Sequence, residues 1–254
     1  MKRLDIILVE KGHFSSRNKA QEAIKDGCVF VNGKLAKASL KVALEDDIKV
    51  SDNINPYVSR AGLKLSHALK EFNISLNDKI VLDVGASTGG FTEVALESGA
   101  KYVYSVDVGT MQLSEKLKNN DKVISYEKTN ILDVDNLYFT KGNPDFIVID
   151  VSFVSIKKII PHLLGFNENI ITLIKPQFET GGKYLRNGVI RDKNIHEKVL
   201  NELFYFFEDV GLNVTNLTFS PIKGKEGNVE FLVYLSKQNG QVSINKTVKD
   251  AYKR

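Results

Sequence analysis

The first fifty positions of the chain carry short hydrophobic segments with helical and strand spacing. An apolar i, i+3, i+4 pattern over residues 4–12 predicts a short helix, and a second helix is expected over residues 17–25. The apolar run 29–31 predicts a strand, and a further strand is expected over residues 47–50. The dipeptide Asn32-Gly33 predicts a hairpin turn, because both residues tolerate a positive φ. This pattern indicates a small α+β unit.

The pattern changes from about Tyr57 onward, where strand-like apolar runs alternate with helical stretches. The expected strands cover residues 80–84, 102–106, 146–149, 170–174 and 231–235. Such alternation implies a parallel or mostly parallel sheet with helices on both faces, so we predict an α/β sandwich. The expected parts are a first domain over 1–55, a linker over 56–63, a second domain over 64–237 and a polar, basic tail over 238–254. The tail is either a frayed helix or unstructured.

Composition and charge narrow the class of protein. The 254 residues are 43% hydrophobic and 26% charged, which is ordinary for a globular protein. A net charge of +4 is compatible with a nucleic-acid partner but does not require one. The single cysteine, Cys28, excludes an internal disulfide and fits a reducing compartment. The four histidines show no metal-ligand spacing, so no metal site is expected.

A glycine-rich turn follows the first expected strand of the second domain. Gly85, Gly89 and Gly90 join that strand to an amphipathic run, and glycines in such a turn let the backbone approach a ligand closely. The spacing departs from the G-x-G-x-x-G of dinucleotide-binding enzymes. With Asp83 two residues before the first glycine, it resembles motif I of class I S-adenosylmethionine-dependent methyltransferases. Asp107, at the end of the next strand, can accept both ribose hydroxyls of that cofactor.

Four charged residues stand where a fold of this kind places its active site. Asp150 follows one expected strand, Lys175 follows the next, and Glu230 precedes the last. Lys64 lies on the helix expected before the first strand. Each residue alone could be an ordinary solvated position, but the four together around the glycine-rich turn form a candidate catalytic set.

The sequence after Asp150 bears on the methyl acceptor. Enzymes that methylate exocyclic or glutamine nitrogens usually carry Asp/Asn-Pro-Pro-aromatic at this point, whereas this chain has Asp-Val-Ser-Phe. A ribose 2′-hydroxyl is the obvious alternative acceptor. It is a weak nucleophile at neutral pH, so it needs a positioned base and a nearby positive charge. Two lysines and two carboxylates meet that need, with either lysine as the base.

These residues resemble the Lys-Asp-Lys-Glu tetrad of FtsJ-like ribose 2′-O-methyltransferases. Nearly the whole chain looks like the TlyA family, whose members carry a haemolysin label and methylate ribosomal RNA. The matching blocks are 57–64, 83–91, 127–130, 150–153, 175–179 and 188–192. Two details depart from the family pattern: Ala61 stands where the family usually has Gly, and Asn-Pro-Tyr-Val forms the linker.

The resemblance implies a substrate and a set of site residues. The acceptor would be a cytidine ribose in ribosomal RNA, and methylation would affect sensitivity to capreomycin-type antibiotics. Shorter members, which this chain resembles, are associated with the 23S site only, whereas longer ones also modify 16S RNA. The catalytic residues would be Lys64, Asp150, Lys175 and Glu230. The residues expected to bind S-adenosylmethionine are Asp83, Gly85, Ala86, Ser87, Gly89, Gly90, Phe91, Asp107, Asn130 and Asp150.

The first domain resembles the αL RNA-binding motif of the ribosomal-protein S-four type. Its signature is carried by residues 3–5, 16–20 and 31–33. Folded RNA is recognised largely through phosphates and shape, which suits a surface of basic side chains. The residues expected to contact RNA are Arg3, Arg17, Lys19, Lys25, Lys34, Lys37 and Arg60.

Two other functions are alternatives to methylation of ribosomal RNA. A membrane-active cytolysin would need a spanning or strongly amphipathic apolar segment, and the apolar runs here are short and strand-like. A non-catalytic RNA-binding protein on a methyltransferase fold would be expected to lose the tetrad or motif I, and both are present. The N-terminus lacks the apolar stretch of a signal peptide, so we expect a cytoplasmic protein. We also expect a monomer.

Overall fold

The structure is a computed structural model, and it describes residues 1–253 except 15, 26–27, 38–39, 44 and 51–54. The side chains of residues 22, 25, 35 and 225 also lie outside the described part. The chain divides into two compact units, a front unit over Met1–Pro56 and a second unit over Tyr57–Arg254. Each unit is described by itself.

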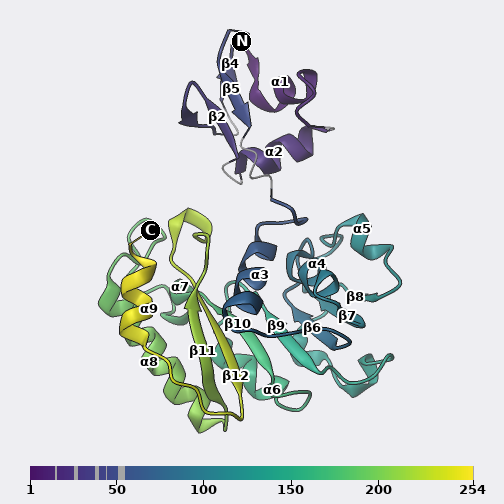
Figure 1. The fold of residues 1–254 in the computed structure, drawn as a ribbon, viewed down its shortest axis with the longest axis vertical. Helices are drawn as coiled ribbons and strands as arrows, with labels where there is room; N and C mark the ends of the chain where they lie inside the picture. Colours follow the sequence, from purple (N-terminus) through teal and green to yellow (C-terminus); the bar gives the residue numbers. More distant parts are fainter. Residues whose placement is uncertain (15, 26–27, 38–39, 44, 51–54, 254) are drawn as a thin grey trace. The chain divides into compact units, whose positions relative to one another are not determined.

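The front unit packs two helices on small sheets (Figure 1). Its elements are β1 (Lys2–Arg3), α1 (Leu4–Glu10), α2 (Arg17–Lys25), β2 (Val29–Val31), β3 (Lys34–Leu35), β4 (Lys41–Val42) and β5 (Ile48–Val50). β1 pairs with β4, and β2 lies between β3 and β5 in an antiparallel sheet. Asn32 and Gly33 both have positive φ, 51° and 73°, as a tight hairpin turn requires. Leu4, Leu8 and Val29 are fully buried in the small core.

The second unit is built on a seven-stranded sheet with the order β11-β12-β10-β9-β6-β7-β8. Its strands are β6 (Ile80–Val84), β7 (Tyr102–Val106), β8 (Val123–Tyr126), β9 (Phe146–Ile149), β10 (Ile170–Ile174), β11 (Asn213–Phe219) and β12 (Phe231–Ser236). β10, β9, β6, β7 and β8 run parallel, whereas β12 is antiparallel to both of its neighbours. The predicted mostly parallel α/β sandwich is confirmed.

Helices cover both faces of this sheet (Figure 1). They are α3 (Ala61–Glu71), α4 (Gly90–Glu97), α5 (Glu115–Lys118), α6 (Ile160–Leu163), α7 (Pro176–Glu179), α8 (Lys193–Asp209) and α9 (Ile244–Ala251). Short 3-10 turns cover Ile131–Asp133, Asn136–Tyr138, Ile156–Lys158 and Lys225–Gly227. Alternate strand residues face opposite layers: Val81 packs with α3 and α4, and Leu82 packs in the cluster that contains α8.

Two strands of the large sheet were not expected from the sequence. β8 and β11 form the two edges of the large sheet, and most of their side chains are only partly buried. Edge strands keep polar residues, so their sequences lack the continuous apolar run that marked the five central strands.

The expected linker over 56–63 and the expected tail over 238–254 also differ from the structure. α3 begins at Ala61, and the N–H of Val58 donates to the carboxylate of Glu93 at 2.5 Å, so this segment is part of the second unit. Most of the polar stretch before Asn55 lies outside the described residues. In the tail, α9 buries Val248 and Ala251 in the core of the second unit, so this helix is packed and not frayed.

Candidate active site

A cavity of about 510 Å³ opens at the carboxyl ends of β6, β7 and β9. This is the edge at which open α/β sheets bind ligands. Five of the residues predicted to bind cofactor lie in its wall, namely Gly85, Ser87, Asp107, Asn130 and Asp150.

The glycine-rich turn forms part of the cavity wall because its backbone comes close to the end of β9. Gly85 has φ +84°, and a Cβ there would lie 2.7 Å from the carbonyl oxygen of Asp150. Only glycine therefore lets the turn after β6 approach the end of β9 this closely. Ser87 follows with φ +49° and donates its N–H to Asp107 Oδ2 at 2.8 Å.

Asp107 is held in place by backbone donors from two sides. Ser87 N–H reaches Oδ2, and Gly109 N–H reaches Oδ1 at 2.7 Å. Each carboxylate oxygen can accept a second hydrogen bond, so the side chain can still receive two hydroxyls. The cavity thus has the carboxylate acceptor, the close backbone approach and the volume that suit a nucleoside-bearing cofactor such as S-adenosylmethionine.

Four residues predicted to touch the cofactor lie behind the turn and do not line this cavity: Asp83, Gly89, Gly90 and Phe91. A Cβ on Gly90 would lie 2.8 Å from the backbone nitrogen of Gly62, so this glycine permits close packing of α3 on α4. Phe91 is a buried core residue. Gly90 and Phe91 therefore support the turn through packing, and the contacts of all four residues with the cofactor stay predictions. Ala86 lines a much smaller adjoining hollow with Ser87 and Asp107.

Asp83 is completely buried beneath the turn. Its Oδ2 accepts the hydroxyl of Thr92 at 2.6 Å, and this hydroxyl lies 2.7 Å from Ser105 Oγ. No cation in the described part of the chain pairs with it, and its Oδ1 has no hydrogen-bond partner there. Burial, aided by the charges of Asp150 and Asp107, raises the pKa of Asp83 to about 7.

The four predicted catalytic side chains meet at one point beside the cavity. Lys175 Nζ lies 2.6 Å from Asp150 Oδ1, and Lys64 Nζ lies 3.7 Å from Asp150 Oδ2. Lys64 Nζ also donates to Glu230 Oε2 at 2.7 Å. All four side chains are nearly buried, and Asp150 belongs to the cavity wall. Residues that span 166 sequence positions are thus brought into one cluster of ion pairs, with a hydrogen bond between Lys64 and Glu230.

The charges in the cluster stabilise one another. Burial alone would lower the pKa of Lys64, but the carboxylates of Asp150 and Glu230 raise it above its ordinary value. Burial would raise the pKa of Asp150, but Lys64 and Lys175 hold it below its usual range. At neutral pH Lys64 therefore remains a cation and Asp150 an anion.

Sequence reasoning missed two residues that fix this cluster. Ser152 Oγ accepts a hydrogen bond from Lys175 Nζ at 2.9 Å. Glu179, on α7, accepts the hydroxyl of Ser155 at 2.6 Å and the N–H of Ile156 at 3.0 Å, so it ties the loop after β9 to the segment after β10. Both residues fall in the family-like blocks, but neither spacing nor hydropathy marks them.

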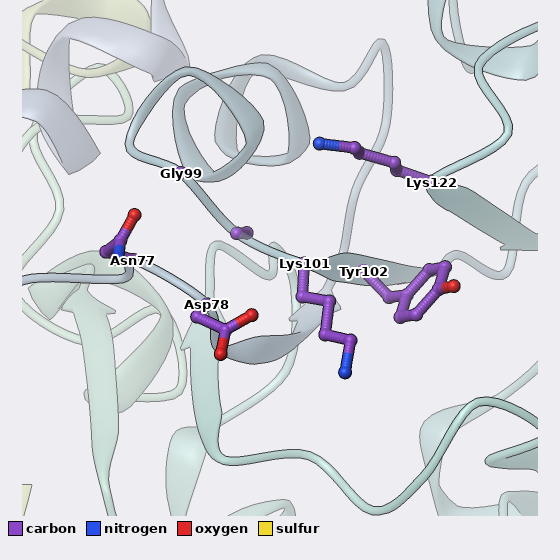
Figure 2. Close-up of a pocket in the computed structure, with 7 residues that line it drawn as sticks. Asn77, Asp78, Gly99, Lys101, Tyr102 and Lys122 are labelled. Atoms are coloured by element: carbon purple, nitrogen blue, oxygen red, sulfur yellow. The ribbon is translucent and has the colours of Figure 1, made fainter.

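A further hollow, of about 480 Å³, lies at the amino ends of the strands, on the side of the sheet opposite to the cavity. It is formed where β7 and β8 begin, and Figure 2 shows Asn77, Asp78, Lys101 and Lys122 around it. None of the predicted site residues lines this hollow, so we do not place the active site there.

The predicted RNA-binding residues fall into two groups. In the front unit, Lys19, Lys34 and Lys37 are exposed, and Arg3 and Arg17 are half-exposed and hydrogen-bonded to Asp5. The side chain of Lys25 lies outside the described part. Arg60 belongs to the second unit, directly before α3.

The described residues contain no group of three or more His, Cys, Asp or Glu side chains that could hold a metal ion. They also contain no helix with the length and apolarity needed to cross a bilayer.

Comparison with known proteins places the chain in a family. The FtsJ-like methyltransferase family matches residues 57–237, and the S4 domain matches residues 2–48. The 16S/23S rRNA (cytidine-2′-O)-methyltransferase TlyA of Mycobacterium tuberculosis is 35% identical over 99% of this chain and 96% of its own length. The 23S rRNA (cytidine-2′-O)-methyltransferase TlyA of Campylobacter jejuni is 36% identical over 87% of this chain and 94% of its own.

A solved structure gives the same relationship in three dimensions. It is a protein of Streptococcus thermophilus that carries the name hemolysin, 42% identical to this chain, with a TM-score of 0.79 over 99% of this chain and 96% of that one. The match extends over both domains and the catalytic blocks, and the chain belongs to the TlyA family of FtsJ-like methyltransferases.

Proposed function

We propose that this protein transfers a methyl group from S-adenosylmethionine to the 2′-hydroxyl of a cytidine in ribosomal RNA. The observation that carries the proposal is the buried cluster of Lys64, Asp150, Lys175 and Glu230 beside a cavity fit for a nucleoside cofactor. The names of the Mycobacterium and Campylobacter relatives support the choice of acceptor.

The cofactor supplies an electrophilic methyl group when bound. Asp107 is placed for its ribose hydroxyls, and the turn at Gly85 and Ser87 is placed for its backbone contacts. Asn130 lies in the same wall and caps the turn that follows it, since its Oδ1 accepts the N–H of Leu132 at 3.1 Å. These residues orient the methyl donor toward Asp150.

We assign different roles to the two lysines. Lys64 is held cationic by two carboxylates, so it stabilises the negative charge that develops on the 2′-oxygen. Lys175, fixed by Asp150 and Ser152, first releases its own proton to solvent and then, as the neutral amine, accepts the proton of the 2′-hydroxyl. Asp150 and Glu230 position the lysines, so that the hydroxyl lies in line with the methyl group.

The base of the target nucleotide has an aromatic platform nearby. Phe153 follows Asp150 by three residues, has φ +64° and leaves 85% of its surface exposed. Its ring lies 4.8 Å from that of Phe178, beside a cavity of about 410 Å³. An exposed ring at this place can stack on a splayed-out base, as RNA-binding proteins commonly do.

We further propose that the front unit binds ribosomal RNA through Arg3, Arg17, Lys19, Lys34 and Lys37. The S4 domain match and the exposure of these side chains support this role. Lys25 and Arg60 remain predicted contacts. We expect the large-subunit RNA to be the main substrate, modified in the cytoplasm by a monomer, with an effect on sensitivity to capreomycin-type antibiotics.

The test is transfer of a labelled methyl group from S-adenosylmethionine to purified large and small ribosomal subunits, followed by nucleoside analysis. The proposal predicts 2′-O-methylcytidine in the large subunit, and no label with a Lys175→Ala control that still binds cofactor. Label on a base, or on protein, would contradict the acceptor. No label despite cofactor binding would favour a non-catalytic RNA-binding protein.

A further inference from the structure

The front unit contains a fully buried carboxylate surrounded by donors. Asp5, on α1, has no exposed surface. Arg3 Nε donates to its Oδ1 at 3.0 Å and Arg3 Nη2 to its Oδ2 at 3.2 Å. Arg17 Nη2 and Nε donate to Oδ2 at 3.1 and 3.4 Å, and Gln21 Nε2 donates at 2.5 Å. Three side chains, one from β1 and two from α2, therefore converge on one carboxylate.

The two arginines use the same side of their guanidinium groups for this contact. Each gives Nε and Nη2 to Asp5, so Nη1 and the remaining N–H of Nη2 point away from the carboxylate. Both side chains keep about half of their surface exposed, 50% for Arg3 and 53% for Arg17. A guanidinium presents its donors as a planar fork that matches phosphate oxygens.

We propose that Asp5 is a positioning residue that holds Arg3 and Arg17 as a paired, outward-facing fork for a phosphate of the RNA backbone. This inference rests on the proposed binding of RNA by the front unit. Asp5 cannot touch RNA itself, because it is buried. Its effect runs through the arginines, whose rotamers it fixes before RNA arrives, so that less conformational entropy is lost on binding.

Charge alone makes the opposite prediction, which is why the inference can be tested. Asp5 is ionised: burial would raise its pKa, but hydrogen bonds from Arg3, Gln21 and Arg17 hold the pKa well below its usual range. If only the local potential mattered, removal of this negative charge would make the surface more positive and RNA binding tighter. If Asp5 positions the arginines, the same change makes binding weaker.

The experiment compares Asp5→Asn with Asp47→Asn in the full-length protein. Asp47 is an exposed carboxylate of the same unit, 3.4 Å from Lys49, and it contacts neither arginine in the described structure. Binding to purified large ribosomal subunits is measured, and circular dichroism melting checks that each variant is folded. We expect Asp5→Asn to raise the Kd roughly three- to tenfold, which is part of the cost of ordering two long side chains, and Asp47→Asn to leave it unchanged or slightly lower.

A second background separates positioning from general stability. In an Arg3→Gln/Arg17→Gln protein, Asp5→Asn should have no further effect on the Kd, because its partners are gone. A further loss of the same size there would mean that Asp5 only supports the fold, and would overturn the inference. So would a folded Asp5→Asn protein that binds as tightly as the wild type.

The outcomes also distinguish this inference from the function on which it rests. Unchanged affinity in the Arg3→Gln/Arg17→Gln protein would refute the proposed RNA-binding face. If Asp5→Asn does not fold, Gln21→Leu keeps the carboxylate and both arginines and removes one donor. A smaller but measurable rise in Kd is then expected, and wild-type affinity would overturn the inference.

Discussion

Each of the two units buries a carboxylate between two cations, which are lysines in the second unit and arginines in the front unit. In the second unit, Asp150 lies between Lys64 and Lys175. In the front unit, Asp5 lies between Arg3 and Arg17. In both, the cations outweigh burial and lower the pKa of the carboxyl. Both pairs of cations keep the buried carboxylate ionised, so the two sites differ in the chemistry that lysine and arginine can perform.

A lysine can lose its proton, whereas an arginine is effectively always charged. A cluster that must accept a proton from a hydroxyl therefore needs lysine. A surface that must hold phosphates needs a permanent charge and a planar fork, which arginine supplies. The choice of cation thus separates a site for proton transfer from a site for binding, although the buried carboxylate is common to both.

Asp83 shows what a buried carboxylate does without a cation. Among the described residues its one side-chain hydrogen-bond donor is the hydroxyl of Thr92, and burial raises its pKa to about 7. Near neutral pH this group is partly protonated, in contrast to Asp5 and Asp150. The three residues together indicate that burial raises the pKa of a carboxyl group and that neighbouring cations lower it again.

The largest expected effect comes from Lys175→Arg, which keeps the charge of the cluster and removes the proton acceptor. We expect methyl transfer to fall about 10³-fold, the usual scale for loss of a general base. The Kd for S-adenosylmethionine, measured by calorimetry, should stay within about threefold of the wild-type value, since Lys175 is not in the cavity wall. Near-normal turnover would show that charge alone suffices and would refute the role assigned to Lys175.

The next effect concerns Asp83→Asn and the pH dependence of stability. Since the folded-state pKa of Asp83 is raised, its contribution to stability is complete below the unfolded value near 4 and is lost as the pH rises through about 7. Asparagine does not titrate in this range, so the variant lacks this pH dependence of stability. The free energy of unfolding of the variant, minus that of the wild type, should therefore rise by about 3 kcal/mol between pH 5 and pH 8 in denaturant melts. A difference that is constant with pH would contradict the raised pKa.

A smaller effect is expected for Arg17→Lys, which keeps the charge but loses the fork. The contacts of Nε and Nη2 with Asp5 cannot both be replaced by one ammonium group. We expect the Kd for large subunits to rise about three- to fivefold, while the slope of log K against log salt stays nearly unchanged, because the number of charges is unchanged. Filter binding at several salt concentrations measures both. Wild-type affinity would show that a point charge is enough at this position.

Much of the architecture was predictable because it depends on local patterns. The central strands β6, β7, β9 and β10 begin and end where the apolar runs do, since a strand buried on both faces needs a continuous hydrophobic sequence. The edge strands β8 and β11 were missed for the converse reason. Three of the four candidate catalytic residues were predictable because they stand at strand ends, and Lys64 was predictable because it lies in a block that resembles the family.

The rest depends on contacts between distant segments. The tie between Gln21 and Asp5 crosses 16 positions, and that between Glu179 and Ser155 crosses 24. No periodicity connects such pairs. The packing role of Gly90 has the same origin, because its neighbour is the backbone of another helix. Sequence patterns mark where a ligand loop lies, but only the packing separates residues that line the cavity from those that support it.

The most direct test of the central claim is the pH dependence of single-turnover methyl transfer with saturating cofactor and large ribosomal subunits. If Lys175 accepts the proton, the wild-type rate rises tenfold per pH unit on the acidic limb, and this limb disappears in Lys175→Arg. In Arg17→Lys the same limb persists at the same maximal rate, because the arginine serves binding alone. An identical acidic limb in Lys175→Arg would contradict the division of roles between the lysine and arginine clusters.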